Sequence, residues 1–442
     1  MTQTTELRQS TEHRLLRGWF ETGGPADLTE HLRRYGPAPL PSERGARQAR
    51  AALLQTVEQA GLTGRGGAAF PTGRKLRAVA EGRGRPVVVV NGMESEPASR
   101  KDEALLDLAP HLVLDGAALA AAAVDATVIH LCLPRGSARA TQVDRLTRAV
   151  AERWRAGLDR IPVEVHRLPH HYVSSEETSL VQWLNGGPAR PLATPPRPFE
   201  KGVDRRPTLV DNVETLAHLA LIARYGPSWF RGTGTADAPG TTLLTVSGAV
   251  HAPGVHELPL GTPLGAVLAA AGGTSRPLGA VLVGGFFGSW LSAEQAPAVP
   301  FARPELAALG AGPGAGVLVA LPADSCGLAE TARVLGFLAA QSARQCGPCR
   351  FGLPAVAADF HQLAWGRPDA ELPARLPHRV ELLAGRGACR HPDGASRLAA
   401  TALAVFAADV RRHLETGPCP GAALPPVLPV PGGPAADEVG WR

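Results

Sequence analysis

An alternation of short β-branched runs and helical segments between residues 87 and 225 is the feature that most constrains the fold. Val87–Val90 is an uninterrupted run of valines, typical of a strand buried on both faces. Two more strands are predicted at 127–133 and 162–168. Helices are predicted around them, at 47–60, 104–124, 138–156, 176–184 and 211–225. The alternation predicts an α/β domain with a doubly wound parallel sheet, whose ligands bind outside the carboxyl ends of the strands.

The composition shifts at residues 232–240, and two further modules follow. The first is a small α+β module with strands at 241–250, 255–258 and 280–283 and a helix at 263–271. The second is a C-terminal helical bundle with helices at 329–342, 353–365, 377–384 and 396–414. The predicted organisation is an N-terminal extension (1–44), the α/β domain (45–235), the α+β module (240–318), the helical domain (324–415) and a Pro/Gly-rich disordered tail (416–442).

Length, charge and hydropathy exclude several classes of protein. A chain of 442 residues suits two to four domains. The chain has 45 Lys and Arg residues and 40 Asp and Glu residues, so its excess of positive charge is small. The basic residues do not form a continuous block, so nucleic acid is not an expected partner. The most apolar stretch, 112–133, is interrupted by Asp115, Asp125 and His130, which argues against a membrane span. We therefore expect a cytoplasmic protein.

Close cysteine spacing gives the sharpest chemical signal. Cys346 and Cys349 form a Cys-Gly-Pro-Cys motif, and Cys389 follows forty residues later. Two thiolates on one tight loop, closed by a distant third, suit an iron–sulfur cluster. Two other interpretations stay open: three buried structural cysteines, or a zinc site completed by His391. The zinc site is disfavoured because His391 lies closer to Cys389 than zinc spacings usually allow.

A glycine-rich loop, Gly64-Arg65-Gly66-Gly67, precedes Phe70 and Lys75. It matches neither a Walker A loop nor the Rossmann fingerprint. It predicts a close approach of backbone to a ligand, with Lys75 available to an anion, and a plain surface turn is an equal alternative.

Polar side chains follow the valine run as Asn91-Gly92-Met93-Glu94-Ser95-Glu96. At the carboxyl end of a strand they are placed to meet a ligand. The alternative is a helix N-terminus with capping acidic residues, and it applies equally to Glu176 and Glu177.

Together these segments resemble the flavin subunit of respiratory complex I, which oxidises NADH and is also found in NAD-reducing hydrogenases and NAD-dependent formate dehydrogenases. The similarity runs from about Gly61 to Leu414. It is carried by four motifs: Gly-Arg-Gly-Gly-Ala-Ala-Phe-Pro-Thr-Gly (64–73), Glu-Ser-Glu-Pro (94–97), Tyr172 with Glu-Glu-Thr (176–178), and Asp-Asn-Val-Glu-Thr-Leu (211–216). The middle module resembles the family's β-grasp, soluble-ligand-binding domain, and the helical domain resembles its cluster domain.

The resemblance implies FMN in the α/β domain, NAD(P)H as substrate, and a 4Fe-4S or 3Fe-4S cluster on Cys346, Cys349 and Cys389. The flavin would pass electrons singly to the cluster. Glu94 and Glu177 are the implied catalytic residues. The implied cofactor-binding residues are Gly64, Arg65, Gly66, Gly67, Phe70, Lys75, Asn91, Ser95, Glu96, Tyr172, Glu176, Asn212 and Thr215. The implied partner is a thioredoxin-like ferredoxin subunit or another electron carrier, with peripheral association with a membrane complex through such partners.

Several positions depart from the family pattern and indicate a divergent paralogue. Ala343 stands where the first cluster cysteine is expected, and Met93 and Asp211 replace an acidic residue and an asparagine beside the flavin. Two aromatic residues that sandwich the nicotinamide are replaced by Ala78 and Arg197. The rival prediction is therefore a non-catalytic or assembly paralogue that has lost flavin or cluster.

Arg197 lies in a basic, Pro-rich loop with Lys201, Arg205 and Arg206. An arginine near the ribose is the usual way to accept a 2′-phosphate, so the loop predicts a shift from NADH toward NADPH. The alternative is that these side chains are solvated or face a partner subunit.

Overall fold

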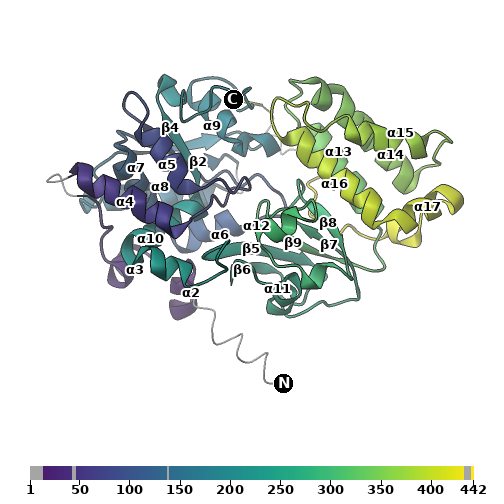
Figure 1. The fold of residues 1–442 in the computed structure, drawn as a ribbon, viewed down its shortest axis with the longest axis horizontal. Helices are drawn as coiled ribbons and strands as arrows, with labels where there is room; N and C mark the ends of the chain where they lie inside the picture. The colour runs from purple at the N-terminus through teal and green to yellow at the C-terminus, as the bar shows by residue number, and fades with distance from the viewer. Residues whose placement is uncertain (1–12, 42–45, 137–138, 433–439) are drawn as a thin grey trace, which may run out of the picture.

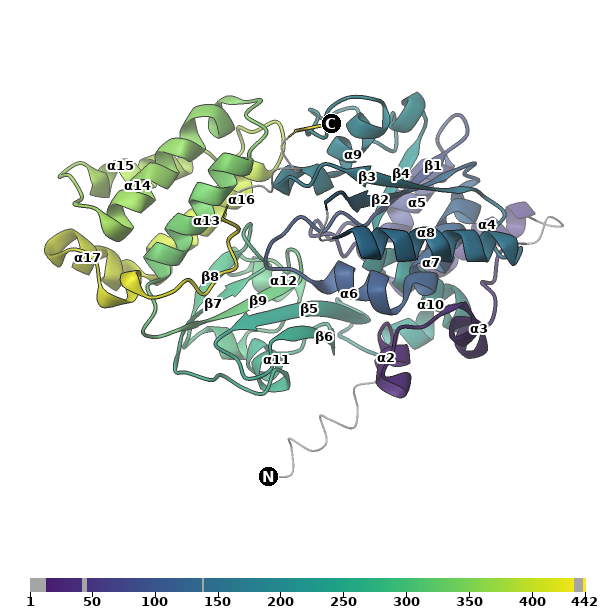
Figure 2. The same cartoon turned by 180° about the vertical axis from the view of Figure 1, so that it is seen from behind.

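A computed structural model describes residues 13–41, 46–136, 139–432 and 440–442. Figure 1 shows an α/β domain on one side, a helical domain on the other and a small sheet between and below them. Figure 2, seen from behind, shows the same arrangement. The predicted fold class, a doubly wound α/β domain followed by a small mixed module and a helical domain, is confirmed.

The α/β sheet has four parallel strands in the order β3-β2-β1-β4. They are β1 (Val87–Asn91), β2 (Ile129–Pro134), β3 (Val163–Leu168) and β4 (Thr208–Asn212). The chain leaves β1 toward β2 and β3 on one side, and then returns to place β4 on the other side. The carboxyl ends of β1 and β4 therefore flank a topological switch point, where open α/β sheets bind ligands.

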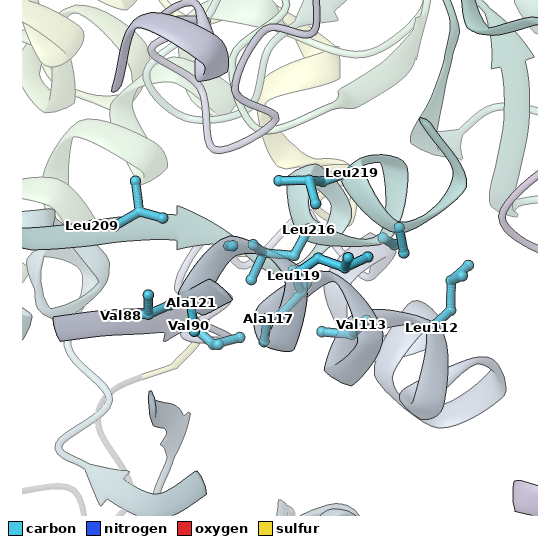
Figure 3. Close-up of a cluster of buried hydrophobic side chains, with 14 of the residues drawn as sticks. Val88, Val90, Leu112, Val113, Ala117, Leu119, Ala121, Leu209, Leu216 and Leu219 are labelled. Carbon is cyan, nitrogen blue, oxygen red and sulfur yellow. The ribbon is translucent and has the colours of Figure 1, made fainter. Parts of the chain in front are cut away.

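Long apolar helices cover one face of this sheet (Figure 3). Val88 and Val90 of β1 and Leu209 of β4 point to side chains of α7 and α10, among them Ala117 and Leu216. Gly116 permits this close helix contact, because a Cβ there would lie 1.9 Å from the carbonyl oxygen of Leu216. The helices of the domain are α4 (Ala46–Ala60), α5 (Thr72–Ala80), α6 (Lys101–Leu108), α7 (Pro110–Val124), α8 (Ala140–Arg155), α9 (Glu177–Leu184) and α10 (Val213–Arg231).

The single helix predicted at 104–124 is two helices, α6 and α7, because Pro110 cannot continue α6 and restricts Ala109 before it. Within the described residues, no single helix has the length and apolarity needed to cross a membrane; only α6 and α7 taken together meet that test, and they are bent by 96°.

The N-terminal extension contributes α2 (Arg17–Thr22) and α3 (Leu28–Tyr35). His31 of α3 contacts the buried Asp115 of α7 at 2.8 Å. The backbone amides of Leu15 and Leu16 donate to the buried carboxylate of Glu257 in the middle module at 3.0 Å. The extension therefore joins the first two domains.

The middle module is a five-stranded mixed sheet in the order β6-β5-β9-β7-β8. One face packs on α11, and the other packs on the helical domain through side chains such as Leu282 and Val319. The elements are β5 (Thr241–Gly248), β6 (Gly254–Pro259), α11 (Leu264–Ala270), β7 (Leu278–Val283), β8 (Ser289–Ser292), α12 (Arg303–Ala307) and β9 (Val317–Pro322). The last two strands and α12 were not predicted from the sequence.

The helical domain has five α-helices among its described residues where four were predicted. They are α13 (Gly327–Gln341), α14 (Leu353–Trp365), α15 (Leu372–Glu381), α16 (His391–Val405) and α17 (Ala407–Thr416). The predicted helix at 396–414 is divided at Phe406 into α16 and α17. A π-helical turn, Pro348–Gly352, leads into α14 and carries Cys349.

The prediction of a disordered tail from 416 is wrong for the residues that the structure describes. Cys419, Ala422 and Leu428 are buried in the helical domain, and the amides of Val427 and Leu428 donate to the buried Glu330 of α13. The last residues reach the α/β domain, where Trp441 stacks on His171 with ring centroids 4.0 Å apart. Apolar residues within the Pro/Gly-rich composition are what dock this segment. Residues 433–439 lie outside the described part.

Candidate flavin and cluster site

Most of the predicted cofactor-binding residues converge at the carboxyl edge of the α/β sheet, between β1 and β4. Asn91 ends β1, and Asp211 and Asn212 end β4. The glycine loop and the start of α5 lie beside β4, since Lys75 donates a hydrogen bond to the carbonyl of Val210. The helices α9 and α10 begin at this edge. The topology thus gathers four segments that are far apart in the sequence.

Backbone contacts of the glycine loop hold it against the end of β4 and the start of α10. The amide of Arg65 donates to Thr215 Oγ1 at 2.9 Å, and Gly66 fits against the Cβ of Asn212. Gly67 has φ +100°, a conformation that favours glycine. Among the described residues, the amides of Gly66 and Gly67 donate to no protein acceptor. Successive free amides beside a helix N-terminus suit a phosphate.

The side chain of Arg65 does not point into this edge. Its guanidinium donates to Thr63 Oγ1 at 3.0 Å and to the carbonyl of Thr241 in the middle module at 3.1 Å. The amide of Arg65 is already bonded to Thr215, and its side chain joins two domains, so Arg65 supports the loop rather than facing a ligand.

Lys75 lies between two carboxylates at the same edge. Its Nζ is 3.4 Å from Glu177 Oε2 and 3.6 Å from Asp211 Oδ1. Burial raises the pKa of Asp211, and the charge of Lys75 opposes that rise. The second oxygen of Asp211, Oδ2, is buried without a hydrogen-bond partner among the described residues. A neutral ligand donor, such as a hydroxyl, would satisfy it, whereas a phosphate would be repelled.

A serine pair connects the end of β1 to the segment before α9. Asn91 Nδ2 donates to the carbonyl of Ser175 at 2.8 Å. Ser95 Oγ lies 2.5 Å from Ser175 Oγ and donates to the carbonyl of Tyr172 at 2.7 Å. Ser175 was missed by sequence reasoning, and only its place just before the Glu-Glu-Thr motif could have signalled it.

Three of the predicted site residues also cap helices. The helix-capping alternative, which the sequence left open for the residues after β1 and for Glu176 and Glu177, is therefore confirmed in part. Glu94 accepts from Ser99 Oγ at 2.5 Å and from two amides at the start of α6, at 3.0 and 3.1 Å. Glu176 accepts from two amides of α9, and burial raises its pKa. Asn212 accepts from the amide of Glu214 in α10 at 3.0 Å. A catalytic role for Glu94 stays a prediction, since its oxygens are already engaged.

A buried ionic network supports Asn212, and sequence reasoning missed it. Lys101 Nζ lies 2.7 Å from Asp102 Oδ1 and 2.8 Å from Glu214 Oε2, and Asn212 Nδ2 donates to Asp102 Oδ2 at 2.6 Å. Burial raises the pKa of Asp102 to about 6, against the charge of Lys101. For Glu214, burial is outweighed by the charge of Lys101, so the pKa lies below its ordinary value.

Glu96 and Tyr172 together join the three domains. Glu96 Oε2 accepts from Tyr172 Oη at 2.7 Å and from the amide of Phe286 in the middle module at 2.9 Å. Gly285 permits that approach, because a Cβ there would lie 2.7 Å from Glu96 Oε2. The Tyr172 ring contacts Phe286, Phe287, Phe337 and His391, which come from the middle and helical domains. Burial raises the pKa of Glu96 to about 7, despite these donors.

We expect Glu96→Gln to remove a fall of stability with rising pH. The ordinary pKa of glutamate is 4.5, so between that pH and about 7 the folded protein holds a proton that the unfolded chain has lost. Unfolding then releases a proton, and stability falls as pH rises, by up to about 3 kcal/mol for this group. Denaturant unfolding of both proteins from pH 4.5 to 8 measures the difference. Parallel pH profiles for wild type and variant would contradict this assignment.

The three predicted cluster cysteines lie near one another, and Cys389 lies near Glu176 at the start of α9. Burial, followed by the proximity of Cys346 and Cys389, raises the pKa of the Cys349 thiol. The charge of Glu176 also raises the pKa of Cys389, after burial. Gln341, at the end of α13, accepts from the amide of Tyr172 at 3.3 Å. The cysteine loop therefore lies against the segment that carries the predicted flavin residues.

The spacing of the thiols favours a cluster over a single zinc ion. The three sulfur atoms do not all lie within 4.8 Å of one another, whereas thiolates on one tetrahedral zinc are about 3.8 Å apart. His391 Nε2 donates to the carbonyl of Leu338 at 2.8 Å, and its Nδ1 is buried without a hydrogen-bond partner among the described residues, so the case against a zinc site rests on the spacing of the sulfur atoms. Ala343 offers no ligand atom, so three thiolates and one non-cysteine position suit this loop.

The other predicted residues are less engaged. Phe70 is half exposed on the glycine loop, and Arg197 is exposed on the Pro-rich loop. Arg206 is committed to structure, since its guanidinium donates to the carbonyls of Arg85 and Pro86. The residues present fit both FMN and an iron–sulfur cluster. The free amides of Gly66 and Gly67 and the unpaired Oδ2 of Asp211 suit a phosphorylated, hydroxyl-rich flavin. The three neighbouring thiols suit iron and sulfide.

This combination defines an electron-transfer flavoprotein with an iron–sulfur domain. Residues 57–221 match the model of the Nuo51 FMN-binding domain, residues 243–283 match the SLBB domain, and residues 329–413 match the NADH-ubiquinone oxidoreductase-F iron-sulfur binding region.

Relatives of known name cover most of the chain. The second F subunit of NADH-quinone oxidoreductase in Rhizobium meliloti (strain 1021) is 31% identical over 388 residues, which are 83% of this chain and 90% of the relative. The NADH-quinone oxidoreductase F subunit of Streptomyces coelicolor is 32% identical over 382 residues, 83% of this chain and 84% of the relative. The chain is also similar to an air-oxidized NAD+-reducing [NiFe]-hydrogenase, with a TM-score of 0.80 at 31% identity, over 91% of this chain and 67% of that chain.

The protein belongs to the family of NADH-quinone oxidoreductase F subunits. The resemblance predicted from the sequence is thereby confirmed, as are an NADH dehydrogenase-type oxidoreductase and the FMN and iron–sulfur domains. The non-catalytic alternative is not favoured.

Proposed function

We propose that this chain oxidises NADH or NADPH with FMN bound between β1 and β4, and that it passes the electrons to a partner carrier through a cluster on Cys346, Cys349 and Cys389. One observation carries the proposal: the cysteine loop lies against Glu176 and Tyr172, at the edge where the predicted flavin residues converge. FMN supplies the conversion between a hydride's two electrons and single-electron carriers.

The residues of this chain would bind the flavin through two kinds of contact. The free amides of Gly66 and Gly67, near the N-terminus of α10, are placed for the phosphate. Asp211 Oδ2 is placed to accept from a ligand hydroxyl or N–H. The single charge of Lys75 lies between Asp211 and Glu177 and offsets part of the repulsion that these two carboxylates would exert on an anionic cofactor.

We assign the donor to a cavity lined in part by Thr178, at the start of α9. It lies between α9 and the Pro-rich loop, has a volume of about 590 Å³, and is lined by residues that include Thr178, Val181, Leu192, Pro196, Lys201 and Arg205. This volume is within the range of small-molecule sites. Two cations in the lining suit the phosphates of a dinucleotide.

We expect slow NADH turnover, a shift toward NADPH, and recovery of NADH activity in Arg197→Phe. An aromatic ring stacked on the dinucleotide contributes on the order of 1 kcal/mol, so the variant should gain about fivefold in kcat/KM for NADH. Steady-state reduction of an artificial acceptor with each donor measures this. A strong NADH preference in wild type that the substitution does not change would contradict the argument.

The partner surface surrounds the cysteines. Arg344, Arg350, Arg386 and Arg390 are all exposed and lie within five residues of Cys346, Cys349 or Cys389 in the sequence, and Phe351 is 69% exposed beside them. Exposed arginines and an exposed apolar ring close to the cysteines in the sequence suit an acidic electron carrier. We propose a thioredoxin-like ferredoxin subunit or a carrier of similar charge, through which the chain would join a larger complex.

Charge reversal tests this surface. We expect Arg350→Glu with Arg386→Glu to slow reduction of an acidic ferredoxin at least about tenfold at low ionic strength, with a weaker salt dependence. Reduction of a small uncharged quinone should not change. Arg411→Glu, on α17, is the matched control, and an equal loss in that variant would place the carrier elsewhere.

The function itself is tested by anaerobic reconstitution with FMN, iron and sulfide. We expect heat-released FMN near one per chain, protein-bound iron, and NAD(P)H-dependent reduction of an acceptor. Flavin-free protein, or zinc in place of iron, would overturn the proposal.

A further inference from the structure

Three metal-ligand side chains lie together on the α/β sheet, apart from the flavin and the cysteines. His130 lies on β2, and Glu164 and His166 lie on β3. His130 and Glu164 are direct register partners, and His166 is two residues further along β3. Because side chains alternate along a strand, Glu164 and His166 share one face. His130 is two residues before Cys132, which lies on the same face as Leu168.

The donor atoms are spaced as the ligands of one metal ion. His130 Nδ1 is 2.9 Å from His166 Nε2 and 3.3 Å from Glu164 Oε2, and His166 Nε2 is 3.6 Å from that same oxygen. The edges of a tetrahedral site with bonds of 2.0–2.1 Å are about 3.3 Å. A point in the plane of the three atoms is about 1.9 Å from each, so an ion just above the plane would reach all three at ordinary bond lengths.

No arrangement of protons gives all three pairs among His130 Nδ1, His166 Nε2 and Glu164 Oε2 a favourable hydrogen bond. An ionised carboxylate only accepts, and a neutral imidazole has one donor and one acceptor nitrogen. If one facing nitrogen carries a proton, the lone pair of the other faces the carboxylate oxygen. If both facing nitrogens carry protons, two N–H groups oppose each other at 2.9 Å. A cation at the centre is attractive to all three atoms at once.

We propose that His130, Glu164 and His166 bind one divalent transition-metal ion, with Zn²⁺ as the expected ion. Two imidazoles and one carboxylate are a donor set for Zn²⁺ and its neighbours, whereas Mg²⁺ and Ca²⁺ require mostly oxygen. The side chain of Glu164 is 55% exposed, so water can reach the proposed ion.

The ion would fix the edge of the sheet. Among the described strands β3 pairs with β2 alone, so it is an edge strand. One ion bound by both strands adds a link there, and the binding free energy adds to the stability of the folded protein. Trp183 of α9 packs edge-on against His166, with ring centroids 5.9 Å apart, so the same ion would also support the helix that opens at the flavin edge.

Metal counting on the reconstituted full chain tests the site. Wild type, His166→Ala, Glu164→Gln and a control, His256→Ala, are dialysed against Zn²⁺ in a competing chelator series, and the retained zinc is measured by elemental analysis. His256 is a histidine of the middle module, on β6. Any zinc bound elsewhere in the chain is common to all variants, so the difference between variants reports this site alone. Thermal unfolding with and without Zn²⁺ is the second measurement.

We expect His166→Ala to retain one zinc fewer than wild type and the control, and Glu164→Gln, which loses a charged ligand, to bind that zinc at least about tenfold more weakly. Zn²⁺ should raise the melting temperature of wild type and the control but not of His166→Ala, and excess Mg²⁺ should not displace it. Equal zinc retention and equal thermal response in wild type and His166→Ala would overturn the proposal.

Discussion

Cys349→Ser should remove the cluster and stop electron delivery to a protein carrier, while the flavin remains bound. Cys349 is buried near Cys346 and Cys389, and a serine hydroxyl is a poor ligand for iron in a soft-ligand cluster. We expect iron to fall below a tenth of the wild-type content, and ferredoxin reduction to fall at least about 100-fold, because the cluster is the proposed route to the carrier. Iron analysis and flavin release on the same sample measure both effects.

Cys326→Ser is the matched control, because that cysteine is equally buried in the helical domain but bonds to His413 and to the start of α13. We expect its iron content to equal that of wild type. Ala343→Cys should act in the opposite direction, since it restores a fourth thiolate and should slow oxidative loss of iron. If Cys349→Ser retained full iron, the three-cysteine assignment would be wrong.

The fold was predictable where local pattern and long-range packing agree. The valine run at 87–90 is apolar on both faces and became the central strand β1. The Cys-x-x-Cys motif predicted a metal-binding loop, because few other structural requirements place two cysteines three residues apart. Pro110 is the informative failure: the apolar pattern continues through it, and only the loss of an amide donor divides the helix.

The site was predictable by position but not by partner. The sequence places Asn91, Lys75 and Asp211 near a strand end or loop, yet it does not show that Lys75 neutralises Asp211 or that Arg65 turns to Thr241. Such pairs depend on three-dimensional proximity over more than a hundred residues. The same applies to the tail. Its composition is typical of a disordered segment, yet Leu428 is buried and its amide donates to Glu330 of α13.

Lys101→Met should destabilise the α/β domain by about 3–5 kcal/mol, because it leaves the buried Asp102 without its cation and the buried Glu214 with Arg65 alone, at 3.8 Å. Asn212 donates to Asp102, so the flavin edge should loosen with it. Denaturant unfolding followed by near-ultraviolet circular dichroism measures the loss. Arg100→Met, one residue earlier and exposed, should change stability by less than about 0.5 kcal/mol.

Adding Glu214→Gln to Lys101→Met should recover part of the loss, since one buried charge is removed. If the double variant were no more stable than Lys101→Met, packing of the lysine stem, rather than its charge, would account for the effect.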